Sequence, residues 1–395
     1  MHRGDSTAMS SPGDARQSKE GPPGVPAGLA PIREKLARGE RLTREDGVTL
    51  YAFPDLLAVG LLADWAARRR HGRTVWYVRN GHLNYSNYCT LACAFCSFYR
   101  RKGTDARPGG YEMSLPEIFA AAERIAATGA TELHLVGGLH PDFPFSYYVE
   151  MLRGLKARFP KLGLKCFTAV EVYHLAKLAR LSPAETLSAL KEAGLDTLPG
   201  GGAEVLDDEV RARICKGKET SAEWLDLHRR AHQLGIRSNA TLLHGHYETP
   251  AQKVAHLLCL RGLQDETGGF LAFLPLPYHP EGNALKIERG PSAYAELREF
   301  AVARLMLDNF PHVKAYWVAS GLGTAQLALS FGASDLDGTV LQEKVYHMAG
   351  AETPQGLSVE ELERLIREAR REPAERDHLY RRVKRSGSGA EDWTV

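Results

Sequence analysis

The chain has 395 residues, of which 44% are hydrophobic and 25% are charged, a composition typical of globular proteins. Its 50 basic and 48 acidic residues leave a formal net charge of +2, so neither nucleic acid nor a membrane surface is expected as a partner. No apolar run approaches the ~18 residues of a membrane span, and the N-terminus has no signal-peptide core. Six cysteines are too few for a secreted disulfide framework, so we expect a cytoplasmic protein.

Five regions follow one another along the chain. Both ends lack apolar periodicity and are rich in Ser, Gly and charged residues, which predicts disorder. We expect a disordered tail at 1–27, a helical segment at 28–80, a core at 81–345, a second helical segment at 346–385 and a disordered tail at 386–395.

Within the core, strand-like and helix-like stretches alternate. Buried strands are predicted over 82–86, 131–136, 164–170, 236–243, 269–276 and 312–318. Ser114 with Glu117, and Ser182 with Glu185, fit boxes that cap the intervening helices. This alternation indicates an α/β fold, a partial or closed βα barrel of the TIM type with helices before it and an extension after it. In such barrels the loops after the strands build the active site.

Three cysteines lie in one short loop, "CTLACAFC", as Cys89, Cys93 and Cys96. A structural zinc site closes with four ligands, and no fourth cysteine follows nearby. A four-iron cluster bound by three thiolates keeps one iron free for another ligand. The spacing therefore favours a [4Fe–4S] cluster with an open iron over the alternatives, a zinc knuckle or inert thiols.

A glycine pair, Gly137 and Gly138, follows the strand predicted over 131–136 and precedes His140. Glycines at the end of a strand allow the backbone to approach a ligand closely. The alternative is an ordinary turn between a strand and a helix. The position of the glycine pair, one βα unit after the cysteine loop, favours ligand binding.

Further candidates follow the later strands. Glu171 comes directly after 164–170, where a carboxylate suits a sugar hydroxyl or a cationic ligand, or else a structural ion pair. The loop after "LDTL" contains Gly200, Gly201 and Gly202 and then Glu204, which indicates backbone contact with a ligand or a tight turn.

Polar residues also accompany the strand over 236–243. Asn239 and Thr241 share one face of it and either meet a ligand or make core hydrogen bonds. Three histidines stand at or beyond strand ends, where each either binds a carboxylate or is structural: His244, His246 and His279. The acidic stretch "SDLDGT" at 334–339, with Glu343, lacks the spacing of a calcium loop and is interpreted as a capping turn or as support behind the site.

The CxxxCxxC loop with Phe95 before its last cysteine resembles the signature of the radical S-adenosylmethionine (SAM) superfamily. The resemblance implies that the three cysteines hold a [4Fe–4S] cluster whose open iron binds SAM. It also implies that the segment with Gly137 and Gly138 contacts the SAM amino group, and that one electron from the cluster releases a 5′-deoxyadenosyl radical.

A finer resemblance extends over roughly residues 40 to 385. The segments "LVGGLHPDFPFSYYVEML", "KCFTAVEV", "GLDTLPGGGAEV", "RSNATLLHGHYET", "QDETGGFLAFLPLPYHPEG" and "GASDLDGTVLQEKVYHMAGA" are similar to the aminofutalosine (aminodeoxyfutalosine) synthase family of the futalosine route to menaquinone. One departure is "PLPYHP", where that family has Phe and Ala before the histidine. The family adds the adenosyl radical to 3-[(1-carboxyvinyl)oxy]benzoate, and it takes its electron from a donor such as flavodoxin or ferredoxin.

Roles for the candidate residues follow from this resemblance. Glu171 and His279 are catalytic candidates, and His140, His244 and His246 are candidates for the substrate carboxylates. Expected contacts with SAM come from Phe95, Gly137, Gly138, Glu171, Gly200, Gly201, Gly202, Asn239 and Thr241.

Two alternative functions stay open. One is a related radical reaction, that of cyclic dehypoxanthinyl futalosine synthase or of the enzymes that form deazaflavin, although "FTAVE" differs from the proline-containing segment of the cyclising relative. The other is a non-catalytic iron–sulfur electron carrier, which a chain of this length does not favour.

Overall fold

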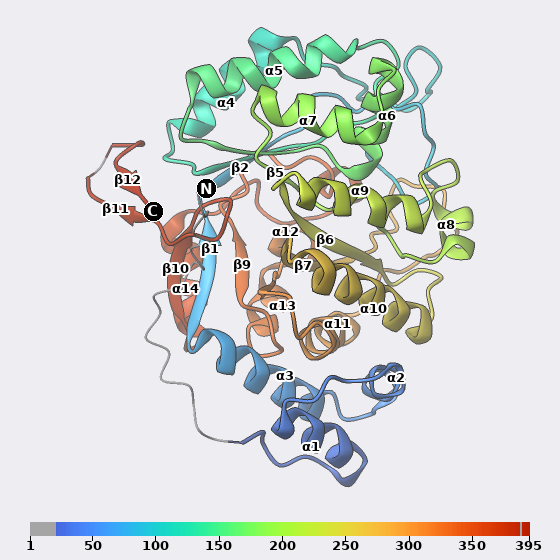
Figure 1. Cartoon of the computed structure of the whole chain (residues 1–395), viewed down its shortest axis with the longest axis vertical. Helices are drawn as coiled ribbons and strands as arrows, with labels where there is room; N and C mark the ends of the chain where they lie inside the picture. Colours follow the sequence, from blue (N-terminus) through green and yellow to red (C-terminus); the bar gives the residue numbers. More distant parts are fainter. Residues whose placement is uncertain (1–20, 388) are drawn as a thin grey trace, which may run out of the picture.

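The structure, a computed structural model, describes residues 21–387 and 389–395 (Figure 1). Most of the tail expected at 1–27 lies outside these residues; a short 3₁₀ turn, η1 (Ala27–Leu29), stands at its end. None of the described helices is both long enough and apolar enough to cross a membrane.

Seven parallel strands form the central sheet. Their spatial order equals their order in the chain, as repeated βα units require. The strands are β2 (Asn80–Leu83), β3 (Glu132–Leu135), β4 (Gly163–Cys166), β5 (Thr197–Leu198), β6 (Arg237–His244), β7 (Phe270–Pro277) and β8 (His312–Val313). The expected partial barrel is thereby confirmed.

Helices follow the strands and cover the outside of this sheet (Figure 1). They are α4 (Leu115–Ala126), α5 (Phe145–Arg158), α6 (Ala169–Ala179), α7 (Pro183–Ala193), α8 (Asp208–Ile214), α9 (Ser221–Gln233), α10 (Pro250–Thr267) and α11 (Ala293–Met306). The capping boxes expected at Ser114 and Ser182 are present at the starts of α4 and α7. Gly194 ends α7 in the left-handed conformation, at φ 118°, where a residue without Cβ is preferred.

A second, three-stranded parallel sheet lies beside the opening of the barrel. It has the order β10 (Glu372–Arg376), β1 (Thr74–Val78) and β9 (Asp335–Gly338). Backbone bridges join Lys314, after β8, to Asp335 and join Gly81, in β2, to Leu341. Residues 335–341 therefore span the gap between the two edge strands of the central sheet.

The terminal segments, which were predicted to be helical or disordered, also contain β-strands. The region 28–80 contains the helices α1 (Ala30–Arg38), α2 (Arg44–Ala52) and α3 (Leu56–His71), but it ends in β1. The region 346–385 contains η2 (His347–Ala349), α14 (Val359–Glu368), β10 and β11 (Lys384–Arg385). β11 pairs with β12 (Trp393–Thr394), which lies in the tail expected at 386–395. These short strands were missed because their partners are remote in sequence or only two residues long.

The strand predicted over 312–318 is also shorter than expected. β8 ends at Val313, and the two short helices α12 (Trp317–Ser320) and α13 (Leu322–Ala328) follow it before β9. Trp317 is fully buried, and its indole nitrogen donates to the carbonyl oxygen of Gly338 at 2.8 Å. The apolar run that predicted a longer strand therefore packs as a buried helix instead.

Candidate active site

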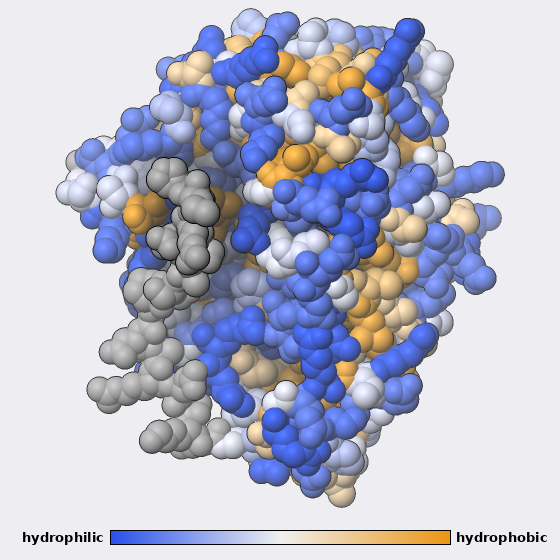
Figure 2. Space-filling view, in the orientation of Figure 1, coloured by the Kyte–Doolittle hydropathy of each residue, from blue (hydrophilic) through white to orange (hydrophobic). Residues whose placement is uncertain are grey.

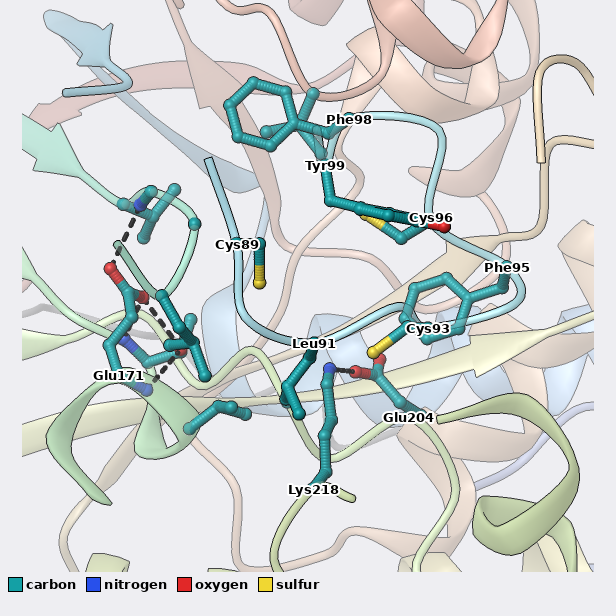
Figure 3. Close-up of a pocket in the computed structure, with 18 residues that line it drawn as sticks. Cys89, Leu91, Cys93, Phe95, Cys96, Phe98, Tyr99, Glu171, Glu204 and Lys218 are labelled. Carbon is teal, nitrogen blue, oxygen red and sulfur yellow. Dashed lines mark hydrogen bonds and ion pairs between the residues drawn. The ribbon is translucent and has the colours of Figure 1, made fainter. Parts of the chain in front are cut away.

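A cavity of about 200 Å³ lies at the carboxyl ends of the first strands of the barrel (Figure 3). Several remote segments build it, as expected for a site formed by the loops that follow barrel strands. Its lining is formed by Cys89, Leu91, Cys93, Phe95, Cys96, Phe98, Tyr99, Val136, Gly137, Gly138, Leu139, Thr168, Val170, Glu171, Gly202, Glu204, Lys218 and Val345.

The cysteine loop, residues 89–96, follows β2 and is held by backbone hydrogen bonds. The amide of Cys89 donates to the carbonyl of Arg100 at 2.9 Å, and the amide of Ala94 donates to the carbonyl of Ile214 at 2.7 Å. Cys93 is buried, whereas Cys89 and Cys96 are half-buried. All three thiols line the cavity, which places the predicted cluster ligands in one site.

Burial controls the charge of these thiols. Desolvation raises the pKa of Cys93 to about 12, although the nearby ammonium of Lys218 acts in the opposite direction. Burial likewise raises the pKa of Cys96. A bound metal ion would supply the positive charge that stabilises the thiolates at this depth.

The arrangement fits a cluster better than a single metal ion. Among the described residues no three His, Cys, Asp or Glu side chains gather as a mononuclear site requires. In a [4Fe–4S] cluster each thiolate binds a different iron, so the three sulfurs surround a volume instead of a point. Three thiols around a cavity whose lining contains no fourth cysteine fit such a cluster, with one iron free.

The glycine pair packs directly against the segment that leads into the cysteine loop. A Cβ on Gly138 would lie 2.2 Å from the carbonyl oxygen of Tyr88, and one on Gly137 would lie 2.5 Å from the ring of Tyr85. The amide of Gly138 donates to the carbonyl of Ser86 at 2.8 Å. These glycines line the cavity, and they are also required for close approach of two chain segments.

Glu171 belongs to a helix start, and not to a strand end as predicted. β4 ends at Cys166, and Thr168 caps α6 with Glu171 as the reciprocal partner of the capping box. Its buried carboxylate accepts hydrogen bonds from the Tyr85 hydroxyl at 2.6 Å, from the Gly137 amide at 3.0 Å and from both the amide and the hydroxyl of Thr168 at 2.7 Å. Burial nevertheless raises the pKa of Glu171. Its observed partners are structural, and they tie the glycine segment to α6.

The glycine loop at 200–202 is only partly in the cavity. Gly202 lines it, at φ 90°, whereas Gly200 packs on β6 with a Cβ position 2.2 Å from the carbonyl oxygen of Asn239. The Thr241 hydroxyl donates to the carbonyl of Gly200 at 3.0 Å, and Trp224 donates to that of Gly201 at 3.3 Å. Asn239 and Thr241 therefore lie behind the loop and not on the cavity wall.

The predicted histidines also lie outside the cavity lining. His140 is fully buried and contacts the Glu112 carboxylate at 2.7 Å, and His246 contacts the carbonyl of Leu243 at 2.9 Å. His279 contacts the carbonyl of Ala319 at 2.9 Å. His244 is buried, burial lowers its pKa to about 4, and its Nε2 has no partner among the described residues.

An ion pair beside Cys93 was not singled out from the sequence. Lys218 donates to the Glu204 carboxylate at 2.5 Å and lies 5.2 Å from the centroid of the Phe95 ring (Figure 3). Burial lowers the pKa of Lys218, but the surrounding acidic groups, led by the carboxylate of Glu204, together outweigh burial and hold this pKa well above its ordinary value. The pair gives the cavity a polar wall opposite Glu171. The stretch "KGKET" has no motif, so only the folded chain reveals this lysine.

Among the described residues, the acidic side chains of the stretch 334–339 form ion pairs with other protein groups. Asp335 pairs with Arg376 at 2.6 Å and Asp337 pairs with Lys314 at 3.2 Å, inside the barrel. Glu343 accepts a hydrogen bond from the amide of Tyr346 at 2.9 Å, in the turn that leads to η2. Residues 335–338 form β9, so the interpretation of this stretch as a capping turn is wrong, and only Glu343 caps a turn.

Comparison with known proteins places the chain in a family. A model of the radical SAM superfamily matches residues 83–258, and a model of the CofH/MqnC C-terminal region matches residues 267–387. The first match contains the cysteine loop and the glycine pair, and the second contains the segment that spans the open edge of the barrel.

Three curated relatives match nearly the whole chain. Aminodeoxyfutalosine synthase of Thermus thermophilus is 46% identical over 90% of this chain and 96% of its own length. That of Streptomyces coelicolor is 43% identical over 88% of this chain and 92% of its own length. Cyclic dehypoxanthine futalosine synthase of Streptomyces coelicolor is 37% identical over 90% of this chain and 88% of its own length.

A solved structure shares the fold. Methylornithine synthase aligns with a TM-score of 0.70 over 86% of this chain and 96% of its own, at 19% identity. The cysteine loop, the glycine segment and the full-length relatives together show that the chain belongs to the radical SAM superfamily, in the family of the aminodeoxyfutalosine synthases.

Proposed function

We propose that the protein forms aminodeoxyfutalosine from SAM and 3-[(1-carboxyvinyl)oxy]benzoate in menaquinone biosynthesis. One observation carries the proposal: three thiols and a glycine segment share one cavity, in a chain that is related over its full length to aminodeoxyfutalosine synthases. The superfamily uses a [4Fe–4S] cluster and SAM, which fits the three-thiol donor set.

Each part of the cavity has a proposed task. Cys89, Cys93 and Cys96 hold the cluster, which supplies one electron to SAM. The backbone beside Gly137 and Gly138 positions the amino group of SAM. The pair formed by Lys218 and Glu204, on the facing wall, provides a cation and an anion for the polar groups of the ligands.

The reaction requires close positioning of two ligands. The 5′-carbon of the adenosyl group forms a bond to the enol-ether double bond, the new radical attacks the arene and rearranges, and loss of carbon dioxide and one electron completes the product. The lining of the cavity is mostly apolar, which suits the arene and the carbon atoms that react. Holding the two reacting carbons in alignment lowers the activation free energy by up to about 7–11 kcal/mol.

The residues behind the cavity have proposed supporting roles. Glu171 acts as a positioning residue for the glycine segment, since its four hydrogen bonds go to protein groups. His244 lies outside the cavity lining, and its Nε2, which has no described partner, is a proposed contact for a substrate carboxylate. We propose a flavodoxin or ferredoxin as the electron donor.

The fate of the adenosyl carbon tests this function. We expect SAM labelled at C5′ to transfer the label covalently into the aromatic product, with methionine and carbon dioxide formed alongside. The measurement is mass spectrometry of products from anaerobically reconstituted protein reduced with dithionite. Recovery of all label in 5′-deoxyadenosine would reject the proposal and favour a relative that abstracts hydrogen.

Cysteine variants supply matched controls for the same assay. Cys93→Ala should give no labelled product, because the cluster loses one of its three thiolates. Cys259→Ala alters an exposed thiol on α10 and should retain the product. Full product formation by Cys93→Ala would contradict the assignment of the cluster loop.

A further inference from the structure

Hydrophilic side chains cover most of the visible face of the molecule, where water hydrates them (Figure 2). The inside of the barrel also contains polar residues, which need partners in the protein or in a ligand. On β2, a Cβ at Gly81 would lie 2.6 Å from Ile125 of α4, so Gly81 faces the outer helices. His82 therefore faces the interior, because neighbouring residues of a strand point to opposite faces. The strand register places His134 of β3 beside it, on the same face.

Three aromatic rings form a row inside the barrel. The rings of His134 and His82 stack with their centroids 4.4 Å apart. Tyr316, in the segment after β8, stacks on His82 with a centroid distance of 6.0 Å. We call His134, His82 and Tyr316 the aromatic row. It connects the first two strands of the central sheet to the segment that follows the last one.

The polar atoms of the aromatic row have no hydrogen-bond partner within residues 21–387 and 389–395. They are not enclosed by protein either, in contrast to the partnerless Nε2 of His244, so the row borders an open space. His134 is accordingly only half-buried although it lies inside the barrel. Burial lowers the pKa of both row histidines, so each neutral ring has one N–H donor. Burial also raises the pKa of Tyr316, whose hydroxyl remains a donor.

The charged groups around the aromatic row are paired with one another. Burial lowers the pKa of His82, whereas nearby carboxylates, that of Glu343 first, act in the opposite direction. These carboxylates and their neighbours form four ion pairs, which are Glu343 with His347, Asp337 with Lys314, Glu132 with Lys165 and Asp335 with Arg376. A ligand that enters here therefore meets balanced charges, and the N–H and O–H groups of the row are donors without a partner.

The row lies one layer below the cavity of the three thiols. Val136 lines that cavity, and its amide continues the ladder to the carbonyl of Leu83 at 3.3 Å. It follows His134 by two residues on the same face, about 6.6 Å along the strand. In the other direction, the buried Glu132 pairs with Lys165 two residues before His134. This ion pair closes the lower end of the barrel, so the space beside His134 opens towards the cavity.

We infer that the aromatic row binds the ring carboxylate of the benzoate substrate, an inference that rests on the proposed function and assigns a subsite within it. The double bond of this substrate must lie at the cavity, next to SAM, and the arene holds the ring carboxylate away from it. One layer deeper, that carboxylate accepts hydrogen bonds from the two imidazoles and the phenol. The faces of the three rings provide apolar contact for the arene.

Equilibrium binding of two matched probes tests the inference. 3-Methoxybenzoate carries the ring carboxylate, and 3-methoxybenzamide has nearly the same shape without the charge. We expect isothermal titration calorimetry of the reconstituted protein with SAM, without reductant, to give a Kd at least about tenfold lower for the benzoate. In His134→Phe and His82→Phe, which keep a stacked ring but lose its nitrogens, this preference should fall below about twofold.

Two further variants control for folding and for the donor. His232→Phe removes the nitrogens of a half-buried histidine on the outer helix α9 and should keep the full preference. His134→Gln restores an N–H donor and should keep more of the preference than His134→Phe. The iron content and the melting temperature show whether each variant folds.

The remaining outcomes contradict the inference in different ways. An unchanged preference in both Phe variants would overturn it, and so would an absence of benzoate binding by the unchanged protein. An equal loss of affinity for both probes would show a general change of shape instead. If the Phe variants weaken 2-phenoxyacrylate, which keeps only the enol-ether carboxylate, the row holds the other carboxylate and the assignment is wrong. Binding needs no turnover, whereas the fate of the C5′ label reports on the proposed function, so the two failures are distinguishable.

Discussion

The carboxylate of Glu171 joins three segments that lie far apart in the sequence. It accepts from Tyr85 before the cysteine loop, from Gly137 after β3 and from Thr168 at the start of α6. An ionised carboxylate satisfies such donors better than any neutral group, because both of its oxygens only accept hydrogen bonds. One side chain therefore sets the spacing between the cysteine loop and the glycine segment.

Replacing this carboxylate should disturb SAM binding before it disturbs the chemistry. In Glu171→Gln, an amide NH₂ faces one of the donors, and the loss of well-matched hydrogen bonds should cost about 1–3 kcal/mol of unfolding free energy. We expect a raised KM for SAM with a smaller change in kcat, measured by SAM cleavage beside urea unfolding. Tyr85→Phe removes a single donor and should give a smaller rise. An unchanged KM for SAM in Glu171→Gln would show that the residue contributes to stability alone.

The sequence contained the correct signal for Glu171, but the apolar pattern dominated it. "TAVE" is a capping-box pattern of the kind that predicted the starts of α4 and α7, yet the preceding "LKCF" extended the predicted strand to residue 170. In the structure Phe167 has φ 60°, a conformation that ends the strand and turns the chain into α6. Lys218 carried no comparable signal, because its place beside Cys93 depends on how the loop before α9 folds back.

At the scale of elements, the hydrogen bonds of one charged histidine hold the 3₁₀ turn η2 in place. The Nδ1 of His347 lies 2.9 Å from the Glu343 carboxylate, and its Nε2 lies 2.9 Å from the carbonyl of Thr353. Both ring nitrogens face acceptors, so the doubly protonated ring fits this site. The hydrogen bond to Glu343 is the main cause that raises the pKa of His347 from its ordinary 6.5 to about 9. Val345, between the two partners, lines the cavity.

This histidine should make the stability of the protein depend on pH. Because its pKa is higher in the folded state, its contribution is fully present below the unfolded value of 6.5 and is lost as the pH rises through about 9. We expect His347→Gln to be less stable than the unchanged protein at about pH 6, with a difference that shrinks towards about pH 10. Urea unfolding across this range measures it, and a difference that is constant with pH would contradict the charged state.

Local patterns predicted those elements whose partners are neighbours in the sequence. The strands of βα units pair with the next strand along the chain, so periodicity and caps sufficed for β3, β4, β6 and β7. By contrast, Trp76 of β1 pairs with Asp335 and Ala374, which no local pattern reveals. The cysteine loop was predictable for the same reason as the strands, since its chemistry lies within eight residues.

For the molecule as a whole, Arg376 connects the two sheets. It is fully buried, donates to Asp335 of β9 at 2.6 Å and lies 3.6 Å from Glu132 of β3. Glu132 is in turn paired with Lys165 of β4 at 2.5 Å. The charges of this cluster are compensated only when β10 is in place beside the barrel.

Removing this cation should destabilise the whole fold. We expect Arg376→Met to lower the unfolding free energy by about 3–5 kcal/mol, because two buried carboxylates lose a shared partner. The exposed Arg382→Met, whose guanidinium lies 5.6 Å from the ring of Trp76, should change it by less than about 0.5 kcal/mol. Thermal or urea unfolding compares the two, and similar values would show that the buried cluster contributes little.

The pairing of β1 with β9 and β10 has a consequence for how the chain folds as it is made. β1 leaves the ribosome roughly 300 residues before the last of its strand partners. At about 5–20 residues per second it waits for roughly 15–60 s with both edges unpaired. During that time an exposed edge strand is open to pairing with other chains. Slower translation therefore lengthens the period in which β1 lacks its strand partners, until the C-terminal segment arrives.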